Sequence, residues 1–430
     1  MENENRIGLK NWTLVWFLGM AGQICWNVEN SWFNTFVYAK IAPDPSIIAW
    51  MVGVSATVST LATFLVGTLS DRLGRRKPFI IIGYLFWGVF TITFGATQFV
   101  PKKQILLAAL FVIAADAIMS CFGSVGYDAG FNAWTTDISN QHNRGRLGGA
   151  IAAMPVLATI FGAVVSGIII DAVDFFPFFI IMGGSVILVG FLTVFTLKDA
   201  PGLKPKRDEK GYWHQFTEVF NIRTVTKNKE LFWVFMIMLF YFISFNIYFP
   251  YITIYFVNFL KLDYAMAGIL QGVGLLAAIL FTIPASRFID KGKSPAVILI
   301  AVITNFTGLI IITVSSGIPV LLAGILGAGT GYVLVLQTLT AWIKNLYPED
   351  QRGQFEGVKQ IFFVCLPMII GPAIATAVIN RYGIPGTIDG VSGMIPTQSL
   401  FVFSAILTCF TVLPLIPAHK YNKIRQNSKS

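Results

Sequence analysis

Four ionisable side chains fall inside stretches of the sequence that otherwise carry almost no charge: Glu29, Asp116, Asp128 and Lys359. A charged group in apolar surroundings is energetically costly, so each of these residues needs a functional or structural reason. A carboxyl group there can take up and release a proton, and can thereby couple a proton gradient to another process. For Glu29 we expect such a coupling or a binding role, with a structural hydrogen bond as the alternative. Asp116 fits a second protonation site and a buried hydrogen-bond acceptor equally well.

Five polar residues recur at helical spacing on either side of Glu29. They are Gln23, Asn27, Asn30, Ser31 and Asn34. Because they lie three or four residues apart, they share one face of a helix, and such a face is typical of a helix that lines a wet cavity. Hydrogen bonds between packed helices are the alternative. Glu29 lies off this face, beside Trp26, and we expect it to point toward a neighbouring helix.

A second group of polar and aromatic residues lies in the C-terminal part of the chain. It comprises Tyr241, Ser244, Asn246, Tyr248, Tyr251, Tyr255, Tyr332, Gln337 and Thr338. Aromatic rings pack on the apolar face of a sugar while amide groups bind its hydroxyls, so this composition suits a small neutral solute. Helix packing and anchoring at the membrane interface are the alternatives. The candidates for binding the solute are Gln23, Trp26, Asn27, Asn30, Asn34, Asn246, Tyr248 and Gln337.

Helices that cross a membrane would position these residues. The 430-residue chain is 55% hydrophobic and only 12% charged, whereas about a quarter of the residues of a soluble domain are charged. Twelve apolar stretches are long enough to cross about 30 Å of hydrocarbon at about 1.5 Å per residue. They cover residues 12–37, 47–70, 79–99, 104–134, 147–171, 176–197, 231–258, 265–288, 296–316, 318–342, 355–379 and 398–417. We therefore expect an all-α protein with twelve transmembrane helices.

The positive charges are distributed unevenly between the two sides of these helices. Of the 31 Lys and Arg residues, 25 lie in the termini and the loops on one side, and five lie in the loops on the other. Because cytoplasmic loops carry an excess of Lys and Arg, both termini are expected in the cytoplasm of a multi-pass protein of the cell membrane. The net charge of +10 then reflects orientation in the bilayer, and we expect no binding of nucleic acid.

A compact charged loop joins the second and third stretches. It runs Gly67-Thr68-Leu69-Ser70-Asp71-Arg72-Leu73-Gly74-Arg75-Arg76-Lys77-Pro78. Asp71 can pair with the cations around it, and Gly67 and Gly74 would permit a close helix approach and a tight turn. A salt bridge between Asp128 and Lys359, made when the inner side is closed, is a further hypothesis. The residues assigned to a cytosolic gate are Gly67, Asp71, Arg72, Gly74, Arg75, Arg76, Asp137, Arg144, Arg352 and Lys359.

The sequence repeats itself at one constant offset. Ala133-Trp134 precedes Ala341-Trp342 by 208 residues, and Arg144-Gly145 precedes Arg352-Gly353 by the same distance. The pattern predicts two pseudo-symmetric halves of six helices each, with a solute site between them near the middle of the bilayer. The expected units are an N-terminal half (1–197), a cytosolic linker (198–230), a C-terminal half (231–417) and a basic cytosolic tail (418–430).

The charged loop resembles the loop between helices 2 and 3 of the major facilitator superfamily, which has the pattern G-x-x-x-D-R-x-G-R-R-K. This resemblance implies the major facilitator fold, transport by alternating access, and a chain that acts as a monomer. The segment Gly22-Gln23-Ile24-Cys25-Trp26-Asn27-Val28-Glu29 is similar to the first helix of proton-coupled sucrose transporters in the glycoside-pentoside-hexuronide:cation symporter group. The segment from Asp128 to Asp137 and the loop Pro348-Glu349-Asp350-Gln351-Arg352-Gly353 also resemble that group.

The narrower resemblance implies proton-driven sugar uptake, in which Glu29 and Asp128 match acids of the group. The sequence departs from the group at Asn132, where relatives have a basic residue or a longer amide. It also departs at Val52, Ser55 and Ser59, which stand where sodium-coupled members carry a carboxylate pair. We therefore expect coupling to a proton gradient rather than to sodium, and no bound cofactor or metal.

Two other functions remain alternatives. A proton-coupled exporter of amphipathic or drug-like solutes would also need acids in an apolar cavity, although the polar face around Glu29 argues against it. A receptor or scaffold on the same fold would have little use for membrane-embedded acids. We expect no enzyme, since the sequence contains no P-loop, no nucleophile elbow and no HExxH motif.

Overall fold

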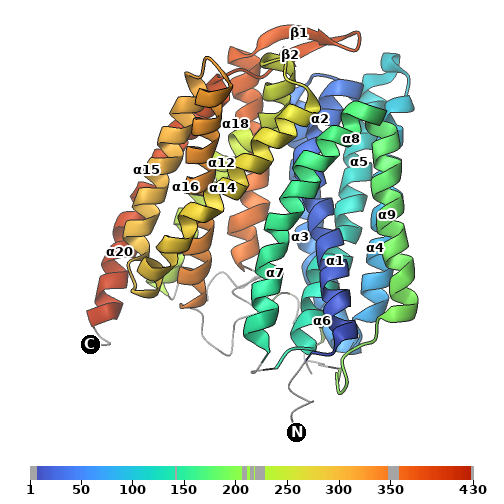
Figure 1. The fold of residues 1–430 in the computed structure, drawn as a ribbon, viewed down its shortest axis with the longest axis vertical. Coiled ribbons are helices and arrows are strands. Elements are labelled where there is room, and N and C mark those ends of the chain that lie inside the picture. Colours follow the sequence, from blue (N-terminus) through green and yellow to red (C-terminus); the bar gives the residue numbers. More distant parts are fainter. Residues whose placement is uncertain are drawn as a thin grey trace.

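The computed structural model describes residues 7–140, 143–205, 211–213, 217, 228–346 and 358–427. The chain forms a bundle of long helices with both termini at the same end (Figure 1). The N-terminal elements, coloured blue to green, lie on one side of the bundle, and the C-terminal elements, coloured yellow to red, lie on the other. We call the end opposite the termini the far end.

The N-terminal half contains six long helices, three of them with π-helical segments. The first consists of α1 (Leu9–Val28), the π-helical segment Glu29–Phe33, α2 (Asn34–Phe36) and the π-helical segment Val37–Ile41. It is followed by α3 (Pro45–Leu73), α4 (Lys77–Ala96), and α5 (Ile105–Gly123), which continues through the π-helical segment Ser124–Phe131 into α6 (Asn132–Asp137). Next come α7 (Arg144–Thr159), the π-helical segment Ile160–Val165, α8 (Ser166–Val173) and α9 (Phe175–Thr196).

The C-terminal half follows the same plan. Its elements are α12 (Lys229–Tyr248), α13 (Ile252–Ile254), the π-helical segment Tyr255–Phe259, α14 (Tyr264–Asp290), α15 (Ser294–Thr313) and α16 (Ile318–Lys344). They continue with the π-helical segment Ile361–Cys365, α18 (Leu366–Tyr382), the strands β1 (Ile384–Ile388) and β2 (Val391–Ile395), α19 (Ser399–Phe410) and α20 (Val412–Asn427). Short 3₁₀ turns cover Thr97–Phe99, Lys102–Gln104 and Phe249–Tyr251.

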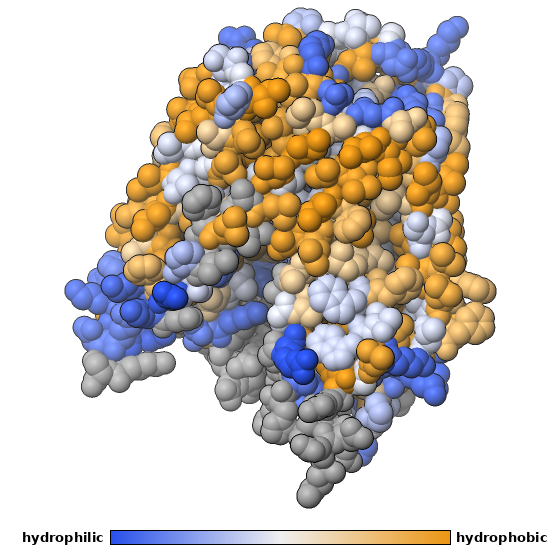
Figure 2. All heavy atoms as spheres, in the orientation of Figure 1, coloured by the Kyte–Doolittle hydropathy of each residue, from blue (hydrophilic) through white to orange (hydrophobic). Residues whose placement is uncertain are grey.

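Ten helices among the described residues are long and apolar enough to cross a membrane. They coincide with ten of the twelve expected stretches. The other two stretches are also helical: one is the helix from Leu9 to Ile41, which carries the polar face around Glu29, and the other is α14. The surface shows a broad apolar band between more polar ends, as a bilayer requires (Figure 2). The chain is a multi-pass membrane protein.

Glycines allow helices within each half to touch through their backbones. A Cβ atom on Gly83 would lie 2.3 Å from the Cα of Gly126, and one on Gly88 would lie 2.4 Å from the carbonyl oxygen of Gly183. In the C-terminal half, a Cβ on Gly308 would lie 2.6 Å from the carbonyl carbon of Gly327. Real Cβ atoms do not come this close, so these crossings require glycine.

The two repeated tryptophans hold the two ends of the linker. The indole N–H of Trp134 donates to the carbonyl oxygen of Lys198 at 3.0 Å, and that of Trp342 donates to Oε1 of Glu230 at 2.8 Å. Both side chains are buried. The sequence repeat of 208 residues therefore has a structural counterpart, since equivalent residues anchor the chain where it leaves one half and where it enters the other.

The expected basic tail is part of the bundle through Asn427, because α20 continues to that residue. Asn422 and Arg425 of α20 both donate hydrogen bonds to the buried carboxylate of Glu230, from Nδ2 at 3.1 Å and from Nε at 2.8 Å. A buried carboxylate needs such partners. The helix therefore extends beyond the last apolar residues because its polar side chains satisfy Glu230.

The far end carries a β-hairpin that the sequence analysis did not predict. Its strands pair antiparallel, with Ile384 opposite Ile395. Asp389 and Gly390 form the turn with positive φ angles of 49° and 81°, a conformation that Asp-Gly favours in two-residue hairpins. The hairpin reaches the N-terminal half at two points, since Met394 N donates to Pro43 O at 2.9 Å and Lys102 Nζ lies 2.7 Å from Asp389 Oδ2.

Four further hydrogen bonds join the halves at this end. Pro45 O accepts bonds from Tyr251 Oη at 2.9 Å and from Thr376 Oγ1 at 3.1 Å. The carboxylate of Asp171 accepts bonds from two backbone N–H groups at the start of α14, from Tyr264 to Oδ1 at 3.3 Å and from Ala265 to Oδ2 at 2.7 Å. We call these six interactions the far-end contacts: Pro43 with Met394, Lys102 with Asp389, Pro45 with Tyr251, Pro45 with Thr376, Asp171 with Tyr264, and Asp171 with Ala265.

Candidate functional site

Glu29 begins the first π-helical segment and points toward a neighbouring helix, as the sequence predicted. Its Oε1 atom accepts a hydrogen bond from Ser120 Oγ of α5 at 3.0 Å. Its Oε2 atom is buried and has no hydrogen-bond partner among the described residues. The carboxyl group therefore has one site open to a proton or to another donor.

Asp116 and Asp128 lie near Glu29, so the structure brings together three of the acids that the sequence singled out. Glu29 is bonded to Ser120, which lies one helical turn after Asp116 and about two turns before Asp128 along the same continuous helix. Asp116 is 2% exposed and lies beside Ser55 of α3, whose hydroxyl donates to the carbonyl oxygen of Val52 at 3.2 Å. Its Oδ1 atom has no partner within the described part of the chain. Three carboxyl groups this close cannot all remain charged without compensation, so the cluster is suited to holding protons.

Asp128 lies in the π-helical segment after α5. Its Oδ2 atom accepts a hydrogen bond from Ser124 Oγ at 2.9 Å, and its side chain is only partly buried. Lys359, also partly buried, has an interaction of its own. The salt bridge between Asp128 and Lys359 was expected for a state closed on the inner side, and it stays a prediction.

Both Glu29 and Asp128 lie in π-helical segments, which occur preferentially at functional sites because the extra residue per turn redirects side chains. Trp26, one turn before Glu29, packs its ring 4.9 Å from that of Trp87. A Cβ on Gly123 would lie 3.1 Å from the Trp26 ring. The indole thus fills the space between α1, α4 and α5 beside the acids.

The polar face of the first helix makes contacts within the N-terminal half. Gln23 Nε2 donates to Tyr127 Oη at 2.7 Å, and Asn27 Nδ2 donates to Thr159 Oγ1 at 3.2 Å. Asn30 Nδ2 donates to the Trp26 carbonyl at 2.7 Å, and Asn34 is buried. Gln23 and Asn27 therefore make hydrogen bonds between packed helices. This was the alternative to lining a cavity. Asn27 Oδ1 is buried and has no described partner.

The three candidate solute-binding residues of the C-terminal half differ in whether they keep a polar atom available to a solute. Asn246 is buried, donates to Phe242 O at 2.8 Å, and packs closely against Gly371, which places it in a helix contact. Tyr248 is hydrogen-bonded to Asn305 of α15. Gln337 of α16 is partly buried, and its Oε1 atom has no partner in the described residues. Of the three, Gln337 retains the free acceptor that a polar solute would need.

Sequence reasoning missed a buried chain of hydroxyls that ends at Tyr248. Ser244 Oγ lies 3.0 Å from Ser404 Oγ and 2.6 Å from Thr408 Oγ1. Thr408 in turn lies 3.4 Å from Asn305 Oδ1. The signal was present in the i, i+4 spacing of Ser404 and Thr408 on α19, but an isolated polar pair in an apolar helix does not reveal its partner.

The charged loop forms a compact ionic cluster around Arg76, which is 3% exposed. Its Nε donates to Asp137 Oδ2 at 2.8 Å, and its other nitrogens donate to Ser70 and Asp71. The predicted pairing of Asp71 with a cation of the loop is confirmed. The planar guanidinium can satisfy three acceptors at once, which explains why arginine occupies the centre.

Sequence reasoning missed Asp199, which follows α9. Its Oδ1 accepts hydrogen bonds from the backbone N–H groups of Arg76 and Lys77 at 2.7 and 2.8 Å. The carboxylate therefore caps the N-terminus of α4, where the helix dipole favours negative charge.

The two glycines of the loop have different roles. Gly74 ends α3 in the left-handed conformation with φ of 61°, and a Cβ there would lie 2.8 Å from Pro205 N. The tight turn expected of it is confirmed. The close helix approach expected at Gly67 is wrong, because a Cβ at Gly67 would meet no atom of the described residues within 4 Å. Arg75 is exposed and Arg72 is partly buried. The Arg144 side chain and Arg352 lie outside what the structure describes.

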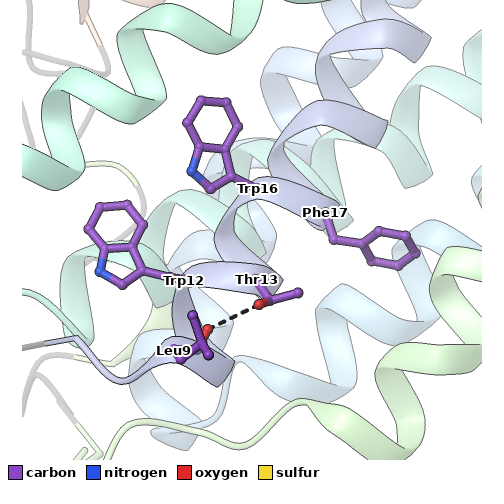
Figure 3. Close-up of a pocket in the computed structure, with 5 residues that line it drawn as sticks. All are labelled: Leu9, Trp12, Thr13, Trp16 and Phe17. Atoms are coloured by element: carbon purple, nitrogen blue, oxygen red, sulfur yellow. Dashed lines mark hydrogen bonds between the residues drawn. The ribbon is translucent and has the colours of Figure 1, made fainter.

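A separate surface pocket lies at the start of α1, lined by Leu9, Trp12, Thr13, Trp16 and Phe17 (Figure 3). Thr13 Oγ1 donates to Leu9 O at 3.1 Å. Aromatic side chains at the beginning of a membrane helix commonly mark the interface with the lipid headgroups. The pocket carries no ionisable residue, and Glu29 lies at the opposite end of α1. We therefore place the site at the acids. The described residues contain no group of His, Cys, Asp or Glu that could hold a metal ion.

Comparisons with known proteins agree with this architecture. The family model of the Major Facilitator Superfamily matches residues 15–372 and 235–429. A mutant of the nucleoside transporter NupG is similar in fold, with a TM-score of 0.74 and 14% identity over 94% of this chain and 99% of that one. A bacterial homologue of the human lysosomal transporter Spinster gives 0.66 and 12% over 95% of each chain. The human organic anion transporter MFSD10 gives 0.61 and 14% over 96% of this chain and 100% of that one.

The search among curated proteins found no match. At these identities the solved structures establish the fold alone, whereas the family model covers more than half of the chain. Together with the ten helices of the described residues that are long and apolar enough to cross a membrane, this match identifies a membrane transporter rather than an enzyme. The chain belongs to the Major Facilitator Superfamily.

Proposed function

We propose that this transporter carries a sugar or glycoside together with a proton by alternating access, with the acid cluster of Glu29, Asp116 and Asp128 as the proton site. The single observation that carries the proposal is that two buried carboxylate oxygens of one transmembrane half, Glu29 Oε2 and Asp116 Oδ1, have no hydrogen-bond partner among the residues that the structure describes. A solute-binding role alone would not require several acids at this depth, because each is costly to bury.

The excess of Lys and Arg in the loops near the termini supports an orientation with both termini in the cytoplasm of the cell membrane. The far-end contacts would then close the extracellular side in this structure. The free acceptor of Gln337, together with the aromatic residues of α12 and α16, supports a neutral, hydroxyl-bearing solute. We propose that the protein acts as a monomer.

Proteoliposomes test this function directly. The internal pH is followed while a panel of sugars is added outside, with Glu29→Gln as the variant and Asp263→Asn as the matched control, because Asp263 is an exposed acid outside the cluster and an asparagine can still cap α14 there. Sugar-dependent proton entry should occur in the wild type and in the control and should disappear in Glu29→Gln. A nucleoside belongs in the panel because NupG, a nucleoside transporter, shares the fold. Proton movement driven only by lipophilic cations would instead identify an exporter of amphipathic solutes.

A further inference from the structure

Four polar residues form a continuous column along one helix of the N-terminal half. They are Asp116, Ser120, Ser124 and Asp128, each four residues after the one before. Residues at this spacing lie on one helical face, and the column spans about 18 Å at about 1.5 Å per residue. Asp116, Ser120 and Ser124 are 2%, 1% and 0% exposed, whereas Asp128 is only partly buried. The column therefore runs from a buried acid to a more accessible one.

Each serine of the column is bonded to a carboxylate rather than to the backbone of its own helix. Ser120 Oγ donates to Glu29 Oε1 at 3.0 Å, and Ser124 Oγ donates to Asp128 Oδ2 at 2.9 Å. Buried serines in membrane helices commonly return their hydroxyl to a carbonyl one turn earlier. Ser166 of α8, for comparison, donates to the carbonyl of Phe161. The hydroxyls of Ser120 and Ser124 are thus available to proton-carrying groups.

We propose that this column is the route by which protons travel between the buried pair Glu29 and Asp116 and the end of the bundle where the termini lie. The inference rests on the proposed proton coupling and adds a path to it. Beyond Asp128 the same helix continues into α6, which lies at that end (Figure 1). Glu29 Oε2 and Asp116 Oδ1, which have no hydrogen-bond partner in the described part of the chain, are the buried proton acceptors at the inner end of the route.

The transfer conserves every hydroxyl. Asp128 takes up a proton from solution, and Ser124 accepts it on Oγ while passing on its own hydrogen. Ser120 repeats the exchange and delivers a proton to Glu29 or Asp116, so both serines end as they began. The Cβ atoms of residues four apart on a helix lie about 5–6 Å from each other, a gap that one water molecule or a rotated hydroxyl bridges.

Other titratable groups face this column and take part in its electrostatics. Cys25 lies one turn before Glu29 on the first helix, and Tyr127 precedes Asp128. The ring of Tyr84 on α4 would lie 3.0 Å from a Cβ on Gly126, two residues before Asp128. The hydroxyl of Ser55 on α3 lies beside Asp116. These groups change the proton affinity of the acids, whereas the serines set the rate at which a proton reaches the acids. A measurement of that rate therefore tests the serines of the column and not the surrounding groups.

Time-resolved infrared spectroscopy of the reconstituted full-length protein measures that rate without a solute. A step from alkaline to acidic pH should produce a carboxylic-acid band, assigned to the buried pair by its loss in Glu29→Gln and Asp116→Asn. Ser124→Ala should slow the appearance of this band by about tenfold or more, the factor that corresponds to one lost hydrogen bond to a charged group. Ser124→Thr, which keeps a hydroxyl, should restore the rate. Ser166→Ala is the matched control for removal of a buried hydroxyl.

The outcomes separate the two proposals. A band that appears at the wild-type rate in Ser124→Ala, or equally slowly in Ser166→Ala, overturns the column as the proton route and leaves proton coupling standing. The absence of any carboxylic-acid band in the wild type overturns proton coupling through the pair, and the column with it. Ser120→Ala supplies a second variant with the same expected slowing, should Ser124→Ala not fold.

Discussion

The Tyr251 hydroxyl of the C-terminal half donates a hydrogen bond to the carbonyl oxygen of Pro45, the first residue of α3 in the N-terminal half, at 2.9 Å. Thr376 donates to the same oxygen at 3.1 Å. One carbonyl therefore uses both of its lone pairs to join the halves. Proline at the first helical position leaves no backbone N–H unsatisfied there. We expect this junction to break whenever the far end opens to a solute.

Removing these donors should shift the protein toward a state that is open at the far end. Tyr251→Phe and Thr376→Val should each weaken the closed state by about 0.5–1.5 kcal/mol. Distances between spin labels placed on the two halves at the far end report the shift as a larger open population. Thr313→Val, which removes a hydroxyl bonded only within its own helix, is the control. If the variant that carries both Tyr251→Phe and Thr376→Val shows the same distance distributions as the wild type, the Pro45 carbonyl has no gating role.

A methyl group at Gly393 should displace the hairpin from the N-terminal half. A Cβ there would lie 2.1 Å from the carbonyl oxygen of Pro43, a backbone atom that cannot yield easily. Gly393→Ala should therefore increase labelling of a cysteine introduced at the far end. Gly386→Ala on the facing strand meets only the flexible side chain of Ile395, so its labelling should equal that of the wild type. Equal labelling in both variants would contradict the hairpin's role in closure.

Arg76→Lys should destabilise the protein by about 2 kcal/mol or more, because a lysine cannot bond Ser70, Asp71 and Asp137 at once and leaves the buried Ser70 or the mostly buried Asp137 without its partner. Thermal unfolding in detergent, followed by tryptophan fluorescence, measures the change. The matched control is Arg75→Lys, since Arg75 is exposed and its replacement should leave the unfolding temperature unchanged. The prediction is wrong if both variants unfold at the same temperature.

Glu230→Gln should loosen α20 from the bundle. The carboxylate accepts hydrogen bonds from Trp342, Asn422 and Arg425, and loss of its charge should cost about 1–3 kcal/mol. Hydrogen exchange of the α20 amides should become faster. Lys423→Ala changes an exposed residue of the same helix and should leave the exchange as it is in the wild type. Equal protection of α20 in Glu230→Gln would show that apolar packing alone holds it.

The proposed pair of Asp128 and Lys359 is tested by exchanging the charges. Asp128→Lys and Lys359→Asp should each reduce transport, and the double exchange should recover more transport than either single variant, because the opposite charges then face each other again. Solute uptake into proteoliposomes provides the measurement. If the double exchange recovers no more than the single variants, the two residues do not form a gate.

The order of the helices could be predicted from the sequence because apolar length reports membrane crossing directly. Their limits could not, since α20 continues about ten residues beyond the predicted end through polar side chains that bond to Glu230. Gly74 could be placed in a turn and Asp71 beside a cation because these effects are local. Asp199 could not be linked to Arg76, which precedes it by 123 residues, because no periodicity relates such positions. For the same reason, the contact between Glu230 and Arg425 could not be predicted from the sequence.

The hairpin does have a recognisable signal in the sequence. Asp389-Gly390 stands between two short runs rich in Ile, Val and Thr, which favours a two-residue turn.

The contacts of the acid cluster could not be predicted from the sequence. Sequence alone identified Glu29, Asp116 and Asp128 as costly residues, but only the packing of the first helix against α5 shows that Glu29 meets Ser120.

The backbone contacts at Gly83, Gly88 and Gly308 lie within the halves, whereas a Cβ on Gly268 would lie 2.2 Å from the carbonyl oxygen of Ala163 in the other half, at a contact that has to separate when the halves move apart. Helices that touch through their backbones have little room to slide, so each half should move as a rigid body. The transport cycle would then be described by one variable, the angle between the two halves. A single pair of fluorophores, one on each half, should follow every step of the cycle in one molecule, and intermediate distances should appear as discrete states rather than as a continuum.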